Sequence, residues 1–221
     1  MPELTSKTAP SMRPSMLVLS YPLDRIDFRP WACSILAVER LEDLHLRPDP
    51  VPFANYVGRL NYYKNLLADN FAAVVDQYLE LASLVAPLFD GINLRQNVPS
   101  FRCHLAGAGS ASDFHRDGDP EYRITPGVIN GWLPLTPVGG RNSLYIEVAP
   151  GSEDYRPVSL QPGEILIFDA YHLKHGSYAN DTRSTRVSFD FRFLPKNPAR
   201  ARELGIVAAE PGDRKRRVDH D

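Results

Sequence analysis

The chain is short of cysteine, of net charge and of long apolar runs, and each shortage excludes a class of protein. Its two cysteines, Cys33 and Cys103, are too few for a disulfide framework and indicate the reduced thiols of a cytoplasmic protein. A formal net charge of −2 gives no general attraction to nucleic acid. The apolar stretch 16–20 is far too short to span a membrane, and no secretory signal is evident. We therefore expect a cytoplasmic protein with neither nucleic acid nor a membrane as a partner.

Length and composition are those of an ordinary globular protein and favour a single domain. The 221 residues are 43% hydrophobic and 24% charged, which is enough for one sizeable core. We expect one domain over 1–221, divided into a disordered leader (1–14), a helical flank (54–90), a strand-rich core (98–195) and a tail (196–221). The basic run 214–217 in that tail is expected to be a solvated chain end. The sequence carries no sign of an oligomeric state.

A helical pattern precedes the strand-rich region. Between Phe71 and Phe89, apolar residues recur at steps of three and four, which predicts one apolar stripe on a helix packed against a sheet. Asp69 or Asn70 could cap the start of this helix, and Gly91 could end it. Upstream, residues 16–19 could form an outer strand.

From Val98 onward, short alternating segments are separated by Gly, Pro, Asn and Asp, which is typical of consecutive strands. The predicted strands are 98–105, 114–117, 128–135, 143–148, 155–159, 164–169 and 184–194. This pattern favours a mainly β fold with flanking α-helices, built as a double-stranded β-helix of the jelly-roll or cupin-like kind. In the last strand, Val187 and Phe189 begin an apolar parity that should pack on helices or on a second sheet. The opposite parity, starting at Arg186, should line a pocket.

The most informative residues are two histidines and a carboxylate. Residues two apart on a strand face the same way, so His115 and Asp117 could aim an imidazole and a carboxylate at one ion. A histidine from another strand would complete a set that favours ferrous iron with open coordination positions. His175 and His172 both compete for that third place, and Asp113 and Asp119 are rivals of Asp117.

A second pair follows eleven residues after His175. Arg186 and Ser188 share a strand face, so a guanidinium and a hydroxyl project together. A planar guanidinium can hold a carboxylate through two parallel hydrogen bonds. An anionic ligand beside the metal is therefore expected.

His115-x-Asp117, the distant His175 and Arg186-x-Ser188 together resemble the iron(II)/2-oxoglutarate-dependent oxygenases. The resemblance covers about 101–194 and extends to the segments 130–136, 142–147 and 162–169. Within that superfamily, the chain is similar to the small bacterial oxygenases of natural-product pathways, of the phytanoyl-CoA-hydroxylase-like and streptomycin-cluster kind. The resemblance implies iron(II) as the metal, 2-oxoglutarate as cosubstrate and O2 as co-reactant.

It also implies roles for individual residues. His115, Asp117 and His175 would be the catalytic metal ligands. His175 is preferred to His172 for its distance to Arg186, and Asp117 is preferred to its rivals because the acid follows the histidine in the family. Arg186 and Ser188 would meet the distal carboxylate of 2-oxoglutarate.

Four residues of the predicted pocket have open roles. Asn130 could hold the cosubstrate or order a water, and Tyr145 could donate a hydrogen bond to the cosubstrate or be a plain buried tyrosine. Trp132 could wall the pocket or belong to the core. Arg102, which shares its parity with His104, could reach substrate or lie at the surface.

Asp190 and Arg192 complete the set of possible substrate contacts. Both lie on the parity of Arg186, and burying such groups is costly unless they are partnered or bind a ligand. Pairing with each other is the favoured interpretation, ahead of binding a substrate amine through Asp190 or a carboxylate through Arg192.

The activity that the resemblance implies is hydroxylation of an unactivated C–H bond of a small metabolite in a biosynthetic pathway, with release of succinate and CO2. Asp117 argues against halogenation, because halogenating relatives carry a small residue there. Desaturation, cyclisation and epimerisation remain open, as do a peptide or protein hydroxylase and a non-catalytic metal-binding sensor. Substrate identity and charge, and any lid from 31–53 or 105–125, are left undecided.

Overall fold

The computed structural model describes residues 5–6 and 16–206. The basic run 214–217 and nearly all of the expected leader lie outside the described residues. Thr5–Ser6, inside the range expected to be disordered, form a short strand, β1, against β2. The division into a single domain stays a prediction.

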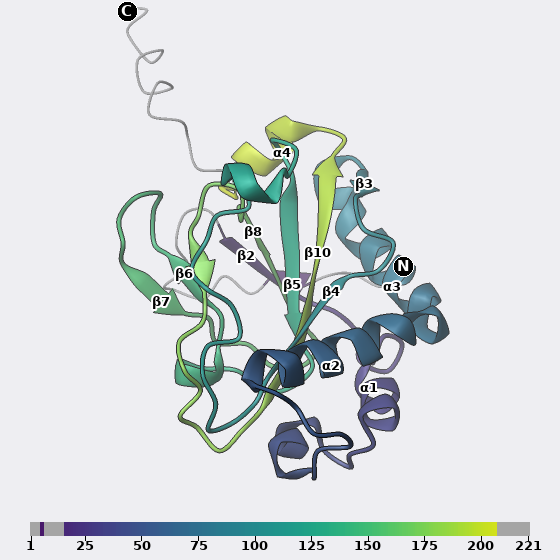
Figure 1. The fold of residues 1–221 in the computed structure, drawn as a ribbon. Helices are drawn as coiled ribbons and strands as arrows, with labels where there is room; N and C mark the ends of the chain where they lie inside the picture. Colours follow the sequence, from purple (N-terminus) through teal and green to yellow (C-terminus); the bar gives the residue numbers. More distant parts are fainter. Residues whose placement is uncertain (1–4, 7–15, 207–221) are drawn as a thin grey trace, which may run out of the picture.

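Two antiparallel sheets make the body of the protein (Figure 1). The large sheet has the order β1-β2-β8-β5-β10-β3, and β4 also pairs with β10. Its strands are Thr5–Ser6 (β1), Met16–Ser20 (β2), Glu164–Phe168 (β8), Ile129–Pro134 (β5), Arg186–Pro195 (β10), Ile92–Leu94 (β3) and Ser100–His104 (β4). The small sheet has the order β7-β6-β9, with strands Tyr155–Pro157, Tyr145–Glu147 and His175–Gly176. The jelly-roll expectation is confirmed.

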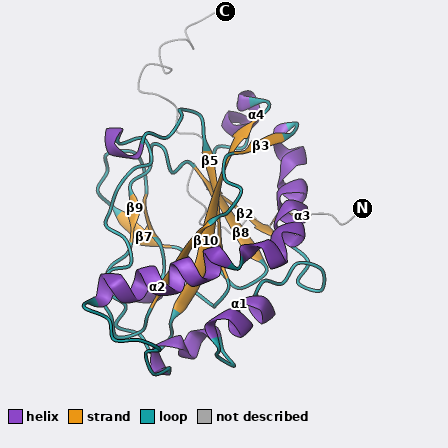
Figure 2. Ribbon diagram, turned by 45° about the vertical axis from the view of Figure 1, so that its right-hand side comes forward, coloured by secondary structure: helices purple, strands orange, loops and turns teal. Residues whose placement is uncertain are grey.

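Helices cover the face of the large sheet that is turned away from the small sheet (Figures 1 and 2). The α-helices are Arg29–Leu36 (α1), Tyr56–Asp69 (α2), Val75–Val85 (α3) and Pro198–Glu203 (α4). Short 3-10 helices span Leu41–Leu46, Phe71–Val74, Ala86–Phe89, Pro120–Tyr122 and Gly140–Asn142. The main hydrophobic core lies between these helices and the large sheet. A second, smaller core lies between the two sheets and contains Trp132, Ile146 and Phe168.

The predicted helical flank is helical but breaks near Asn70. Asn70 closes α2, because its side-chain amide donates to the Leu66 carbonyl, and it makes no side-chain cap for the helix that follows. The N-terminal cap belongs to Asn55, whose side chain accepts from the Gly58 N–H. Phe71–Phe89 is long and apolar enough to cross a membrane by length and composition alone. Its buried apolar side chains, such as Phe71, Tyr78 and Phe89, belong to the main core, whereas Leu79 is exposed.

Strand β10 divides its residues as the alternation predicts. Val187, Phe189, Phe191 and Phe193 are fully buried against the helices, and Phe28 meets Phe189 edge to face with ring centroids 5.0 Å apart. Arg186, Ser188, Asp190 and Arg192 project from the other face. On β4, Arg102 lies opposite Ser188, so it shares this inner face.

The predicted strand 114–117 is wrong. His115 forms one isolated bridge to His175, and the chain then turns away. The turn occurs because the Asp117 and Gly118 N–H groups donate to the Ala170 and Tyr171 carbonyls, which follow β8, instead of continuing the ladder. His115 and Asp117 therefore come from a loop fastened at two points.

Candidate metal and cosubstrate site

The loop carrying His115 is fastened directly to β9, which carries His175. Each residue's N–H donates to the other's carbonyl, at 3.0 and 2.9 Å. Gly176 allows this approach, because a Cβ there would lie 2.8 Å from the Phe114 Cα. The fold thus brings together two histidines that are sixty positions apart in the chain.

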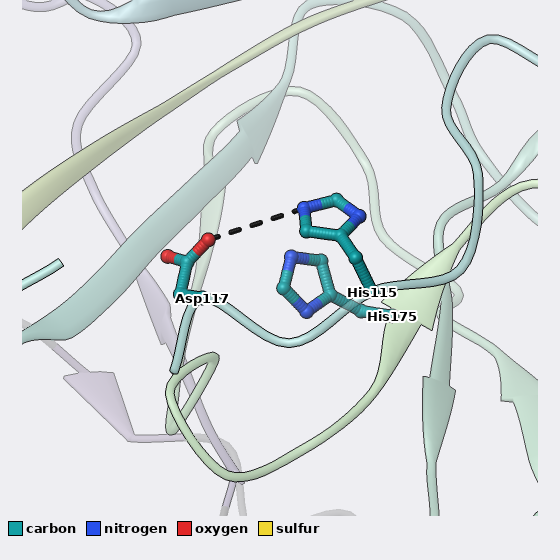
Figure 3. A group of neighbouring side chains, drawn as sticks. All are labelled: His115, Asp117 and His175. Carbon is teal, nitrogen blue, oxygen red and sulfur yellow. Dashed lines mark ion pairs between the residues drawn. The ribbon is translucent and has the colours of Figure 1, made fainter. Parts of the chain in front are cut away.

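His115, Asp117 and His175 form one cluster (Figure 3). Their ligand atoms all lie within 4.8 Å of one another, and His115 Nε2 is 3.9 Å from Asp117 Oδ1. Each histidine Nδ1 faces a backbone carbonyl, that of Asp113 at 2.8 Å and that of Leu173 at 3.0 Å. A neutral imidazole that donates from Nδ1 to such a carbonyl keeps its lone pair on Nε2, which is the form in which a histidine binds a metal.

The rival ligands lie elsewhere. His172 Nδ1 is 2.8 Å from Asp169 Oδ2, outside the cluster. The Asp119 carboxylate accepts from the Arg116 N–H, and Asp113 lies exposed at the rim of a neighbouring cavity. Of the residues that the structure describes, the only group of three or more histidine, cysteine, aspartate or glutamate side chains placed to share an ion is the expected one.

Arg192 has a role that the sequence did not reveal. Its Nε and Nη2 donate to both oxygens of Asp117, at 2.7 and 2.9 Å. Burial raises the pKa of Asp117, but these bonds outweigh it and hold that pKa below its usual value. The favoured pairing of Arg192 with Asp190 is secondary, with the closest atoms 3.9 Å apart. The alternation of residues along β10 predicted that Arg192 lies on the face of Arg186. It could not predict the partner, because Asp117 lies on a loop whose position depends on distant segments.

Three buried polar groups on the inner faces of β5 and β10 have no hydrogen-bond partner within the described chain. They are Arg186 Nε, Ser188 Oγ and Asn130 Oδ1. Arg186 is 1% exposed and its one hydrogen bond is a long one, 3.4 Å, from Nη1 to the Asn142 carbonyl. Burial, and then the charge of Arg102, lower the pKa of Arg186 to about 10. A buried guanidinium without an anion is costly, so the arrangement fits an absent carboxylate ligand.

The remaining expected residues divide. Trp132, Asp190 and Arg102 line the same cavity as the metal residues, and Trp132 also belongs to the second core. Tyr145 does not line that cavity, and it packs against Tyr178 with ring centroids 4.8 Å apart.

Of the two segments for which a lid was left undecided, only one borders the site. Ser110, Ser112 and Tyr122 of the loop 105–125 line the cavities at the metal cluster, whereas no residue of 31–53 lines either of them. Helix α2, for which the sequence predicted only a place in the helical flank 54–90, forms another wall of the neighbouring cavity.

No family model matches the chain. The chain is 34% identical over 154 residues to the streptomycin biosynthesis protein StrG of Streptomyces griseus, covering 69% of this chain and 67% of StrG. Together with the cluster of His115, Asp117 and His175, the buried Arg186 and the jelly roll, this relationship shows the family. The chain belongs to the iron(II)/2-oxoglutarate-dependent oxygenases. Iron(II), 2-oxoglutarate and O2 are accordingly its cofactors and co-reactant.

Solved structures of this oxygenase fold agree. AviO1 from Streptomyces viridochromogenes Tue57 superposes with a TM-score of 0.51 at 19% identity, over 83% of this chain and 91% of AviO1. EvdO2 from Micromonospora carbonacea var. aurantiaca, solved in complex with 2-oxoglutarate, gives 0.51 at 14% identity, over 82% and 86%. At these identities the likenesses show the fold alone.

Proposed function

We propose that this oxygenase hydroxylates an unactivated C–H bond of a small metabolite in a natural-product pathway. The observation that carries the proposal is the position of the unpartnered Arg186 Nε and Asn130 Oδ1 atoms, whose side chains line the same cavity as His115 and His175. The chain's likeness to a streptomycin biosynthesis protein supports the pathway class.

The residues present fit iron(II) and 2-oxoglutarate. His115, His175 and Asp117 offer two imidazoles and one carboxylate, the set that suits non-haem iron(II) with open positions. When bound, these cofactors with dioxygen supply the oxidising power that breaks a C–H bond, and 2-oxoglutarate leaves as succinate and CO2.

The chain's own residues supply position and shelter. Arg192 fixes the orientation of the Asp117 carboxylate, and each carboxylate oxygen retains a lone pair for a metal. Arg186, with its fork of donors, and Ser188 would hold the distal carboxylate of the cosubstrate. Trp132, Leu144 and Phe168 are buried apolar walls of the cavity and exclude water from it.

A neighbouring cavity supports a small metabolite over a peptide as substrate. It has a volume of about 400 Å³, within the range of small-molecule sites, and it shares Arg102, Ser112 and His115 with the metal cavity. A substrate bound there would lie beside the metal ligands.

The test compares Arg186→Met with His175→Ala under anaerobic conditions, and Arg95→Met, an exposed arginine at the end of β3, is the matched control. Binding of 2-oxoglutarate is followed by the charge-transfer band of the iron complex. Arg186→Met should weaken cosubstrate binding about a hundredfold or more while iron still binds, because a guanidinium fork to a carboxylate is lost. His175→Ala should weaken iron binding itself.

Admission of air should then give succinate from the wild type and from Arg95→Met, and none from His175→Ala. Products of a metabolite screen distinguish hydroxylation from desaturation, cyclisation and epimerisation by mass. Unchanged cosubstrate affinity in Arg186→Met would refute the clamp, and a wild type that binds no 2-oxoglutarate would favour a sensor.

A further inference from the structure

One face of helix α2 lies over the cavity beside the metal cluster. Val57, Leu60, Asn61 and Lys64 follow one another at helical spacing, and all four line this cavity. Val57 is 61% exposed, which is unusual for a valine on a helix that otherwise packs on β4. The opposite wall is formed by β4 and by the loop 110–122.

Two cations of this cavity have no ion pair within the described part of the chain. Lys64, half-buried on α2, makes no hydrogen bond or ion pair there, and Arg102 makes one bond, from Nη1 to the Phe101 carbonyl at 2.9 Å. Arg102 also lines the metal cavity, so it stands where the two cavities join. The acid that lines the outer cavity, Asp113, is exposed, and water screens its charge.

The charges around the metal do not cancel when the site is loaded. Arg192 is neutralised by Asp117, and the two charges of iron(II) are balanced by the two carboxylates of 2-oxoglutarate. Of the other charged residues that line the metal cavity, Arg186 and Arg102 are positive and only Asp190 is negative. One positive charge is left over in a half-buried space, where an unpaired charge is costly.

We infer that the substrate carries an anionic group, a carboxylate or a phosphate, which Arg102 and Lys64 hold in the α2 cavity. This inference rests on the proposed function and adds the charge class of the substrate. The anion would lie between helix α2 and strand β4, and the rest of the molecule would extend past Ser112 and His115 toward the metal. The polar side chains of Asn61 and Tyr122 offer further hydrogen bonds along the walls.

The experiment measures binding to the full chain, loaded without dioxygen with iron(II) and 2-oxoglutarate. Four probes share one ring and differ in charge: glucose, glucosamine, glucuronate and glucose 6-phosphate. Calorimetry should give at least one anion an affinity about tenfold above that of glucose, since one added ion pair in a half-buried site is worth about that factor. The two anions show whether carboxylate or phosphate is preferred.

Variants then test the residues. Lys64→Gln and Arg102→Gln should each reduce the preference for the anion, and Lys196→Gln, an exposed lysine after β10, should leave it unchanged. Cosubstrate affinity is measured in every variant, so that damage to the metal site is separated from loss of the anion contact.

The outcomes distinguish a failure of the proposed function from a failure of the inference about the charge of the substrate. A wild type that binds no 2-oxoglutarate in the presence of metal overturns the proposed function and this inference together. If 2-oxoglutarate binds normally, two results overturn this inference and leave the proposed function standing. In the first, glucose or glucosamine binds as tightly as the anions, and in the second neither anion binds. A preference that survives in both Lys64→Gln and Arg102→Gln also overturns it.

Discussion

The same substitution at two arginines of one strand face should have opposite effects on stability. Arg186 is buried without an anionic partner, whereas Arg192 holds the fully buried Asp117 through two hydrogen bonds. In the protein without metal and cosubstrate, Arg186→Met removes an uncompensated buried charge. Arg192→Met instead creates one, on Asp117.

The magnitudes follow from the structure. The pKa of Arg186 falls from its ordinary 12.5 to about 10, and the folded state thus disfavours its charge by about 3 kcal/mol at neutral pH. Removing the charge should recover this free energy, but the smaller methionine side chain packs less well and offsets part of the gain. Arg186→Met should therefore raise the free energy of unfolding by about 2 kcal/mol. Arg192→Met should lower it by about 3 kcal/mol, the lower end for breaking a buried pair, since Arg192 remains partly exposed.

Urea unfolding of chelator-treated protein at neutral pH measures both, with Arg95→Met as the neutral control. Adding Asp117→Asn to Arg192→Met should restore part of the loss, because the stranded charge is gone. Added metal and 2-oxoglutarate should then stabilise the wild type strongly, while 2-oxoglutarate adds little to Arg186→Met. A destabilised Arg186→Met in the metal-free protein, or losses of equal size at both arginines, would show that Arg186 is not an uncompensated buried charge.

Three further predictions concern the site. Gly176→Ala should lower stability by about 1–3 kcal/mol and weaken metal binding, because the added Cβ meets the Phe114 backbone. Gly139→Ala is the control, because its Cβ meets only Ser159 Oγ, at 3.7 Å. Equal metal affinity in the two variants would contradict this prediction. Ser188→Ala should weaken 2-oxoglutarate binding about tenfold in calorimetry without destabilising the metal-free protein, since its Oγ has no partner there. Burial, and then Arg186, lower the pKa of His104 to about 3 from an ordinary value of 6.5, so the unfolded chain takes up a proton that the folded chain refuses. His104 therefore costs about 1.4 kcal/mol of stability per pH unit as pH falls below about 6.5. Urea unfolding of His104→Gln should show a free energy of unfolding that falls with decreasing pH by that much less per pH unit than in the wild type. An unchanged pH dependence would rule out a neutral buried His104.

The fold class and the candidate metal site could both be predicted from local patterns and motifs in the sequence. Alternation in 186–193 separated the core face from the site face, because side chains alternate along any strand. The spacing of His115, Asp117, His175 and Arg186 carried the family. These features are local or motif-borne, so they need no knowledge of which segments meet.

Tertiary structure decided what depends on contacts between distant segments. The loop geometry of His115 and Asp117 follows from bonds to β9 and to the end of β8, and no local preference signals these. The pairing of Arg192 with Asp117 joins residues seventy-five positions apart. The placement of α2 over the cavity follows from its packing on β4, which turns a face with Val57 and Lys64 toward the metal site instead of into the core. The sequence left open whether residues 31–53 form a lid; in the structure they join the main core through Leu36, Leu41 and Leu44 and line neither cavity of the site.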